Sequence, residues 1–547
     1  MIETVRTFTA LAEEFVELYL RHHPVEATRA GIHDYDRLLP NDTAEGLRER
    51  SVWLQDLEHR LVASVPWQEL PVEHRADYGI LRARLSALRA DLDEVKIYAK
   101  NPVLYPETAL HSVFLLLARP GTPLEERKEA ILERMIAIPD YLAVAKKNLQ
   151  QVPDQYLNIA ADVTLSAPGF VEEVCRTLLK NFPGEGERIE HAGSRARKGF
   201  LQYQQFIDQD LEAKIGGTFA IGERWMNYKL EREHLLALDC KKLDALGREQ
   251  VTKVTAELEA EARRVDPSKT WKQQLEAAKD RHPEPLRLRE AYVAELERAR
   301  AFVQDMRIAP IGGEPPLVIL DTPVFERATQ PLATYLPPAP FDASPAGCLC
   351  VTPADPARRK DEQQQQIEAH HNAAISLVCV HEGYPGHHLQ FGQSFKNGSR
   401  LRRLSRSPVT AQGWALYCEE LMAEAGFFTD PIGRLYQLRD LLWRACRVVV
   451  DAGLHTGNMG FMQAVDYLVT TALIPRVNAV LEVRRYTLRP TEPMSAMIGK
   501  LELVALRDET RQRLGERFNL HEFHAAVLAS GPIPTALLRE ELKLRMP

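Results

Sequence analysis

The sequence predicts a mainly α-helical protein with one small β-containing segment. Over most of the chain, apolar residues recur three and four positions apart among Glu, Lys and Arg, which is the pattern of amphipathic helices. Between Ile308 and Pro356 the pattern changes to prolines and short β-prone pieces. We therefore expect one body (1–547) with a helical first part, a β-containing segment and a helical last part, at 1–305, 306–360 and 361–547.

The clearest helices lie in the first part. Lys241–Val265 and Leu286–Met306 are long, amphipathic and rich in Glu and Arg, which favour helices. Ala130–Leu149 keeps the same period on both sides of Pro139. Because proline interrupts helical hydrogen bonding, we expect two helices or one bent helix there.

Two short pieces predict a small antiparallel sheet in the middle segment. Leu317–Leu320 and Cys348–Thr352 are β-prone, and Gly347 and Pro353 flank the second piece. Helical period returns from Glu362 onward. The glutamines at 363–366 then predict a solvated helix start.

Composition and charge restrict the class of partner. The chain has 69 Lys and Arg against 76 Asp and Glu, a formal charge of −7, and no sustained basic stripe, so we expect no nucleic-acid or membrane partner. Seven cysteines without a C-x-x-C pair favour reduced thiols. Met1–Leu20 lacks signal-peptide features, and the apolar run Ala373–Val380 is too short to span a bilayer. We expect a cytoplasmic protein that acts on a small molecule or peptide.

One stretch, Leu377–Gln390 (LVCVHEGYPGHHLQ), has the residue types of a metal site. In zinc hydrolases the pattern H-E-x-x-H places two histidines one helical turn apart, with the Glu as general base. Here Pro385 occupies the fourth position after His381. The Gly-Tyr-Pro-Gly segment must therefore turn the chain to bring a later histidine back. Adjacent His387 and His388 point apart, so we expect only one of them to bind metal.

A polar loop without metal is the alternative interpretation of three histidines beside a Gly-Pro turn. The chain has a His-Glu pair and a His-His pair within eight residues, behind an apolar run. This density of ligand-type residues favours metal binding, and zinc is the expected cofactor.

Further motifs follow this stretch in order: GWALYCEEL at 413–421, RVVVDAGLH at 447–455 and RRY at 484–486. Together with HEGYPGHHLQ at 381–390 they resemble the domain of unknown function 885 (DUF885) family. The resemblance extends from HPVEATRAGIHDYDRLLP at 23–40 to GPIPTALL at 531–538. It implies a large multi-helix, zincin-like fold similar to neurolysin and carboxypeptidase Taq, and zinc-dependent peptidase activity.

The resemblance also implies roles for residues of the first motif. His381 and His387 match the zinc ligands, and Glu382 matches the general base. By analogy with zinc peptidases, Gly347–Pro353 would be an edge strand that pairs with extended substrate; a plain structural hairpin is the alternative.

The third ligand departs from the family pattern. The usual E-G-W-A-L-Y-x-E has the spacing of neurolysin-type enzymes, in which a Glu follows the ligand Glu after seven residues, but here Gln412 and Glu419 occupy the two positions. An amide oxygen is a poorer zinc ligand than a carboxylate. Either Gln412 binds zinc weakly, Glu419 or Glu420 replaces it, or the site holds little metal. For Glu419, a supporting or surface role is equally open.

A second departure follows RRY. Where the family usually reads G-Q-A-x-S-Y-x-x-G, this chain has TEPMSAMIG at 491–499, so Ala496 replaces the tyrosine. If that hydroxyl stabilises the oxyanion in relatives, Tyr486 or His455 must replace it here. The alternative for His455 is a core histidine with satisfied hydrogen bonds.

Three residues are candidates for substrate contact. Arg444 and Arg485 could hold a substrate carboxylate bidentately, and His388 lies beside the expected ligand. Arg444 could instead be a buried partner of Asp440 or Asp451.

The sequence therefore predicts a zinc hydrolase that cleaves peptide or related amide bonds. Zinc would polarise the scissile carbonyl and a water, and Glu382 would pass the proton of that water to the leaving nitrogen. A catalytically impaired family member that acts as a binding or scaffold protein is the alternative. It is motivated by Gln412 and Ala496, which stand where charged and hydroxyl groups are expected.

Overall fold

Helices make up most of the computed structural model, which describes residues 2–119, 122–323, 326–327, 330 and 332–547. Contacts within the chain group the residues into two compact units. Unit 1 comprises Met1–Ile221, Pro323–Ala328 and Ala339–Ala346, and unit 2 comprises Gly222–Thr322, Thr329–Pro338 and Gly347–Pro547. The two units therefore meet near residue 221, which lies inside the helical first part that the sequence predicts at 1–305.

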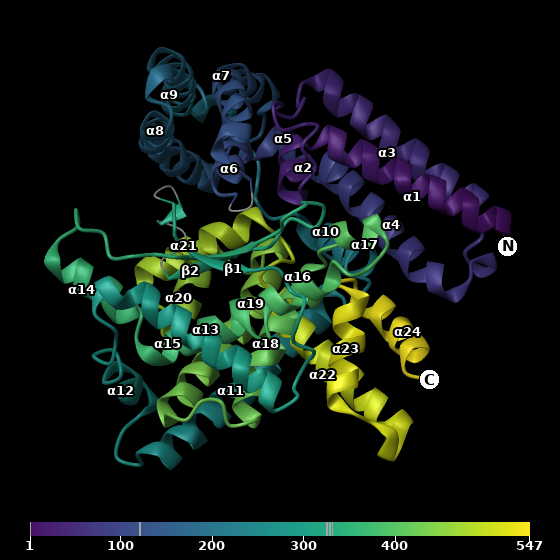
Figure 1. Ribbon diagram of the computed structural model, residues 1–547, viewed down its shortest axis with the longest axis vertical. Coiled ribbons are helices and arrows are strands. Elements are labelled where there is room, and N and C mark those ends of the chain that lie inside the picture. The colour runs from purple at the N-terminus through teal and green to yellow at the C-terminus, as the bar shows by residue number, and fades with distance from the viewer. Residues whose placement is uncertain (1, 120–121, 324–325, 328–329, 331) are drawn as a thin grey trace. The chain divides into compact units, whose positions relative to one another are not determined.

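Unit 1 is built from helices that pack in pairs. Helix α1 lies against α3, and α9 lies against both α7 and α8 (Figure 1). The predicted segment Ala130–Leu149 is one helix, because α7 continues through Pro139. The helices are α1 (Ile2–His22), α2 (Pro24–Ala30), α3 (Ala44–Ser64), α4 (Val72–Arg89), α5 (Ile97–Lys100), α6 (Leu104–Leu117), α7 (Leu124–Asn148), α8 (Asp154–Asn181) and α9 (Gly186–Gln209), with short turns at Trp67–Glu69, Ala90–Val95, Pro183–Glu185 and Glu212–Lys214.

The first helices of unit 2 along the chain confirm the predicted amphipathic segments. Lys241–Val265 and Leu286–Met306 correspond to α11 and α13, and α14 has no buried residue, as the solvated glutamines predict. The helices up to this point are α10 (Gly222–Tyr228), α11 (Cys240–Val265), α12 (Trp271–Glu276), α13 (Leu288–Asp305) and α14 (Lys360–Ala369), with short turns at Lys229–Glu233 and Pro285–Arg287.

The remaining helices of unit 2 form its densest packing. Helix α18 packs along α22, and α19 packs along α11 and α20. These helices are α15 (Asn372–Val378), α16 (His387–Ser394), α17 (Arg400–Leu404), α18 (Pro408–Glu424), α19 (Pro431–Thr456), α20 (Phe461–Thr471), α21 (Arg476–Leu488), α22 (Ser495–Leu514), α23 (Leu520–Ser530) and α24 (Thr535–Arg545), with turns η8 (Cys379–Gly383) and η9 (Gly515–Arg517). The prediction of a mainly helical fold is confirmed. Every described helix is too short or too polar to cross a membrane.

The sheet of unit 2 has three strands in the order β1 (Leu317–Asp321), β3 (Gly347–Val351), β2 (Ala333–Leu336). Strand β3 pairs parallel with β1 and antiparallel with β2, so the sheet is mixed and the prediction of an antiparallel sheet is wrong. A local β-prone pattern does not encode the direction of pairing, and here the chain passes through β2 before β3 enters the centre. Because β3 is bonded on both sides and all its residues are buried, it is not an edge strand open to substrate.

Two motif glycines allow α18 and α22 to cross with their backbones in contact. A Cβ on Gly413 would lie 2.3 Å from the carbonyl carbon of Gly499, and a Cβ on Gly499 would lie 1.7 Å from the carbonyl oxygen of Val409. No side chain fits at either position. The crossing fixes the helix that contains the GWALY motif against the core of unit 2.

Candidate metal centre

The chain folds back on itself between the two motif histidines. Helix α15 continues into the wide turn η8, and the backbone N–H of Gly386 bonds to the carbonyl of Val380 at 3.1 Å. A Cβ on Gly386 would lie 1.9 Å from the carbonyl oxygen of His381, so only glycine allows this return. Helix α16 then begins at His387, as the predicted turn requires.

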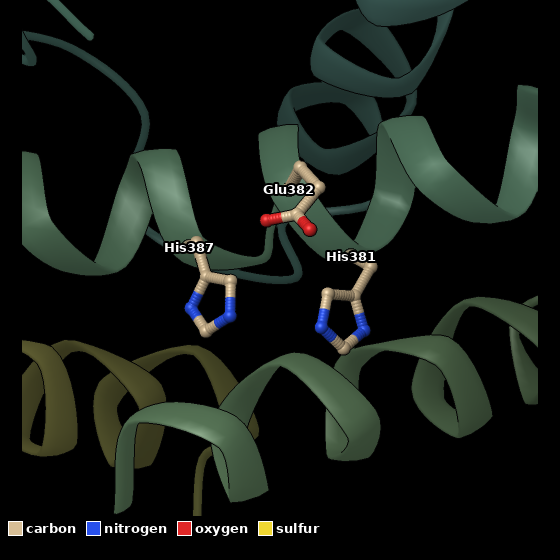
Figure 2. A group of neighbouring side chains, drawn as sticks. All are labelled: His381, Glu382 and His387. Atoms are coloured by element: carbon tan, nitrogen blue, oxygen red, sulfur yellow. The ribbon is translucent and has the colours of Figure 1, made fainter. Parts of the chain in front are cut away.

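The return brings His381, Glu382 and His387 into one group. Their ligand-type atoms all lie within 4.8 Å of one another. The two imidazole rings are 5.1 Å apart and nearly perpendicular, at 85°. Figure 2 shows the carboxylate of Glu382 between the rings. The geometry thus unites the three residues that the first motif predicts.

Glu419 orients His381 from behind its ring. Its Oε1 lies 2.6 Å from Nδ1 of His381, and its side chain is buried on α18. Burial raises the pKa of Glu419 well above its ordinary value. A cation at Nε2 of His381 would favour the ionised form, in which the carboxylate accepts from Nδ1–H and the lone pair of Nε2 remains available. A carboxylate behind a histidine is the usual support of a metal-binding imidazole. This contact matches the supporting role among the alternatives for Glu419, and metal binding by Glu419 stays a prediction.

Gln412 lies two turns before Glu419 on α18 and faces both histidines. Its amide raises the pKa values of His381 and His387, against the larger effect of burial. It is only partly buried, whereas residues 413–419 are buried. The position that the spacing predicts for the third ligand is thus beside the two imidazoles, and it carries a neutral amide.

Burial sets the charge of the group. It lowers the pKa values of His381 and His387 to about 3, so both imidazoles are neutral at physiological pH and can offer lone pairs. It raises the pKa of Glu382 to about 8, an effect that the guanidinium of Arg444 opposes. A carboxyl group that titrates near neutral pH is suited to accept and return a proton.

The tryptophan of GWALY joins α18 to the turn. Trp414 is fully buried, and its Nε1–H donates to the carbonyl of Pro385 at 2.8 Å. This bond connects the helix that carries Gln412 and Glu419 to the turn between the two histidines. A direct hydrogen bond therefore holds α18 against the turn that carries the two histidines.

His388 points away from the group, as expected for the neighbour of His387. Its Nε2–H donates to the carbonyl of Pro315 at 2.9 Å, so its Nδ1 accepts from the hydroxyl of Tyr335 at 3.0 Å. Both ring nitrogens are engaged and the side chain is fully buried. These contacts make His388 a structural link between β2 and α16, and its contact with substrate stays a prediction.

Tyr335 is a neighbour of the site that the sequence reasoning missed. Its ring lies parallel to that of His387, with centroids 6.3 Å apart and an angle of 7°. A Cβ on Gly347 would come within 2.8 Å of both the Tyr335 hydroxyl and Nδ1 of His388, so this glycine makes room for their bond. The only available signal was an aromatic residue in a β-prone piece, which is also typical of plain strands.

His455 and Tyr486 contact each other in the core of unit 2. Nε2 of His455 bonds to the backbone carbonyl of Tyr486 at 3.0 Å, and Asp451 lies 3.9 Å from the same nitrogen. Both side chains are almost completely buried. The bond of Nε2 to a backbone carbonyl is the kind of contact that the alternative of a core histidine requires. The catalytic roles of the two residues stay predictions.

The two candidate arginines lie beside acidic partners. Nη2 of Arg444 is 3.7 Å from Asp440, the partner that its alternative interpretation names. Nη2 of Arg485 is 2.6 Å from Glu482. The effect of Arg444 on the pKa of Glu382 shows that its charge acts on the site. Substrate binding by either residue stays a prediction.

The donor set fits a zinc ion. Two neutral imidazoles with an oxygen ligand are among the sets that zinc binds. The ligand-type atoms lie within 4.8 Å of one another, and they would move closer together to reach zinc bonds of about 2.0–2.1 Å. Nδ1 of His387 is buried without a hydrogen-bond partner among the described residues. A buried imidazole nitrogen without a partner is what a site prepared for a cation contains.

Together, the fold and the site define a mainly helical protein with a buried His, Glu and His group of metal-binding type. The chain belongs to the DUF885 family, "Bacterial protein of unknown function", whose profile matches residues 24–542. No curated protein matches the sequence.

Two solved structures share the fold over nearly the whole chain. A "putative lipoprotein of unknown function" from Shewanella oneidensis is 21% identical with a TM-score of 0.78, and the match covers 98% of this chain and 99% of that one. A "putative lipoprotein" from Colwellia psychrerythraea is 17% identical with a TM-score of 0.85, and the match covers 99% of each chain.

These descriptions contradict the predicted cytoplasmic location. Both proteins with this fold are described as lipoproteins, a class that the sequence-based expectation did not include. The expectation rested on charge, thiols and the residues at 1–20. None of these features determines the compartment in which a folded chain works.

Proposed function

We propose that this protein is a zinc-dependent hydrolase of peptide or related amide bonds. The observation that carries the proposal is the group of His381, Glu382 and His387, in which a carboxylate lies between two neutral imidazoles. The resemblance of the motifs to zincin-like peptidases of the neurolysin and carboxypeptidase Taq type supports the same chemistry.

His381, His387 and the amide oxygen of Gln412 would hold the zinc. When bound, zinc acts as a Lewis acid that polarises the scissile carbonyl and a water. Glu382 takes a proton from the attacking water and delivers it to the leaving nitrogen. Burial, which raises the pKa of Glu382 to about 8, makes it a stronger base than an exposed carboxylate. Glu419, bonded to Nδ1 of His381, would leave Nε2 of that ring to hold the metal.

A binding or scaffold role is the second candidate, and Gln412 is the observation that favours it. A neutral amide beside two imidazoles gives a weaker zinc site than a carboxylate. Such a protein would bind peptide without cleaving it.

The lipoprotein descriptions of the two solved structures support a further proposal, that this chain also works outside the cytoplasm. Fractionation of cells that produce the full-length native protein tests it. Recovery only with the cytosolic fraction would contradict it.

The first experiment measures zinc stoichiometry by mass spectrometry of the metal in untagged, full-length protein. We expect one zinc per chain, loss of zinc in His381→Ala and His387→Ala, and no change in His59→Ala, which alters an exposed histidine. Incubation with a peptide library then separates the enzyme from the scaffold. Zinc without cleavage would favour the scaffold, and equal zinc in all variants would refute the site.

A further inference from the structure

A stripe of charged and polar residues runs along the otherwise apolar helix α19. Its members are Asp440, Arg444, Arg447, Asp451 and His455, and their spacings of three and four residues place them on one face. Most of α19 is buried, so this stripe takes ionisable groups into the interior of unit 2. Each of these groups needs a partner there.

Arg447 has no such partner. Its side chain is 8% exposed, and no hydrogen bond or ion pair joins it to any described residue. Its contact is with the ring of Tyr486, whose centroid lies 5.4 Å from Cζ. Burial lowers the pKa of Arg447, which means that the surrounding carboxylates do not compensate its charge. An uncompensated buried guanidinium is costly unless an anion binds to it.

The nearby carboxylates are already engaged. Asp440 lies 3.4 Å from Arg439 and 3.7 Å from Arg444, and Glu482 is bound by Arg485 at 2.6 Å. Asp451 accepts from two backbone N–H groups, and the charge of Arg447 lowers its pKa against the larger effect of burial. Nη1 of Arg444 is also buried without a partner among the described residues. Two guanidinium groups on one face of α19 thus have N–H donors to offer a ligand.

These donors lie within electrostatic reach of the metal group. The charges of Arg444 and Arg447 both lower the pKa of His381, and that of Arg444 also lowers the pKa of Glu382. Helix α19 also packs against α15, which leads into the turn that carries His381 and Glu382, and against α18, which carries Gln412 and Glu419. An anion held by the two arginines would therefore lie near the metal group.

We propose that Arg447, together with Arg444, binds the free C-terminal carboxylate of the peptide substrate. The planar guanidinium fork matches a carboxylate in two parallel hydrogen bonds, and one monoanion balances the one arginine that lacks a carboxylate. A carboxylate bound at this place limits hydrolysis to bonds near the C-terminus. This inference rests on the proposed hydrolase and specifies its substrate class as peptides with a free C-terminal acid.

The test compares matched peptides on the zinc-loaded full chain. One N-acetylated peptide with neutral side chains is supplied as the C-terminal acid and as the C-terminal amide, and a third peptide is the amide with glutamate near its end. Binding is measured by calorimetry and cleavage by mass spectrometry. The variants are Arg447→Met, Arg447→Lys and the control Arg476→Met, whose arginine is exposed and paired with Asp466 on the surface.

We expect the acid to bind about 10- to 100-fold more tightly than the amide. Arg447→Met should abolish this preference without lowering the melting temperature, because it removes an unpaired buried charge. Arg447→Lys should keep part of the preference, and Arg476→Met should keep all of it. A preference for the glutamate-containing amide would overturn the terminal carboxylate in favour of an acidic side chain.

The outcomes separate this inference from the hydrolase proposal. Equal binding and cleavage of acid and amide would overturn the carboxylate site while the hydrolase stands. Selective binding of the acid, lost in Arg447→Met, without any cleavage would support the carboxylate site and refute the hydrolase. If Arg447→Met has a lower melting temperature but keeps the preference for the acid, Arg447 has a purely structural role.

Discussion

Unit 2 contains two buried clusters of ionisable groups that differ in what their side chains contact. The histidine cluster comprises His381, Glu382, His387, Gln412 and Glu419. The Asp451 junction comprises Asp451, His455 and the backbone of Tyr486, Thr491 and Met494. In the histidine cluster, side chains face other side chains around a shared space.

In the Asp451 junction, side chains bond to backbone. Asp451 accepts from the N–H groups of Thr491 at 3.2 Å and Met494 at 3.1 Å, and His455 bonds to a backbone carbonyl. Such contacts fix the chain between α21 and α22. The comparison shows that burial of ionisable residues does not by itself identify a site. The groups to which these residues bond distinguish the two cases. Side chains that face one another can hold a ligand, whereas side chains that bond to backbone hold a loop in place.

The largest expected effect is the loss of turnover in Glu382→Gln. Removing the general base should slow cleavage by about 10²- to 10⁴-fold, because proton transfer to and from a positioned group contributes that much. Zinc content and melting temperature should not change. The kinetics are compared with Glu509→Gln, which alters an exposed carboxylate paired with Arg539. Full activity of Glu382→Gln at normal zinc content would remove Glu382 from the mechanism.

The next largest effect is expected on zinc affinity, from a change of Glu419, which bonds to His381. Glu419→Gln removes the charge that stabilises a metal-binding imidazole, so zinc affinity should fall by about 10- to 100-fold. Competition with a chelator measures this. Glu420→Gln is the matched control, because Glu420 is adjacent on α18 but pairs with Arg434 and Lys500. A larger effect from Glu420 than from Glu419 would make Glu420 the functional carboxylate.

A smaller effect is expected from Gln412→Glu. An anionic oxygen beside two imidazoles should tighten zinc by about tenfold, a free energy of about 1.4 kcal/mol. Chelator competition and melting of the metal-free protein are measured together. Loss of stability with unchanged zinc affinity would show that Gln412 does not face the metal.

Local sequence patterns predicted the long helices and the residues of the first motif. The amphipathic period of α11 and α13 extends over many residues, so their ends match within two positions. His381, Glu382 and His387 meet because Gly386 permits the return that the motif required. The spacing of Gln412 to Glu419 selects an amide that acts on the pKa values of both imidazoles, and its role as a zinc ligand stays a prediction. In each case the information is local, or is carried by helical geometry.

Features that depend on distant pairing were not predictable in the same way. Strand β2 has four residues and no alternation of burial, and the parallel pairing of β1 with β3 depends on the path between them. For that reason Tyr335 and its bond to His388 were missed. The sequence shows Arg447 as the first residue of RVVVDAGLH. Its lack of a carboxylate partner can be recognised only from the positions of the surrounding helices.

The last prediction applies the same chemical change, carboxyl to amide, to the Asp451 junction. Burial raises the pKa of Asp451 to about 7 in the folded chain, whereas an unfolded Asp titrates near about 3.9. Between these values the folded state holds a proton that the unfolded state releases, so the contribution of Asp451 to stability falls as pH rises from about 4 through 7. Asp451→Asn does not titrate, and its stability relative to wild type should therefore improve from pH 5 to pH 8. Denaturant unfolding at both pH values measures the difference in stability between the variant and wild type. At each pH the variant should bind zinc as tightly as wild type does, because the junction does not touch the histidine cluster. A difference that stays constant with pH would show that the two backbone N–H groups keep Asp451 ionised, and a loss of zinc would show that the two clusters are coupled.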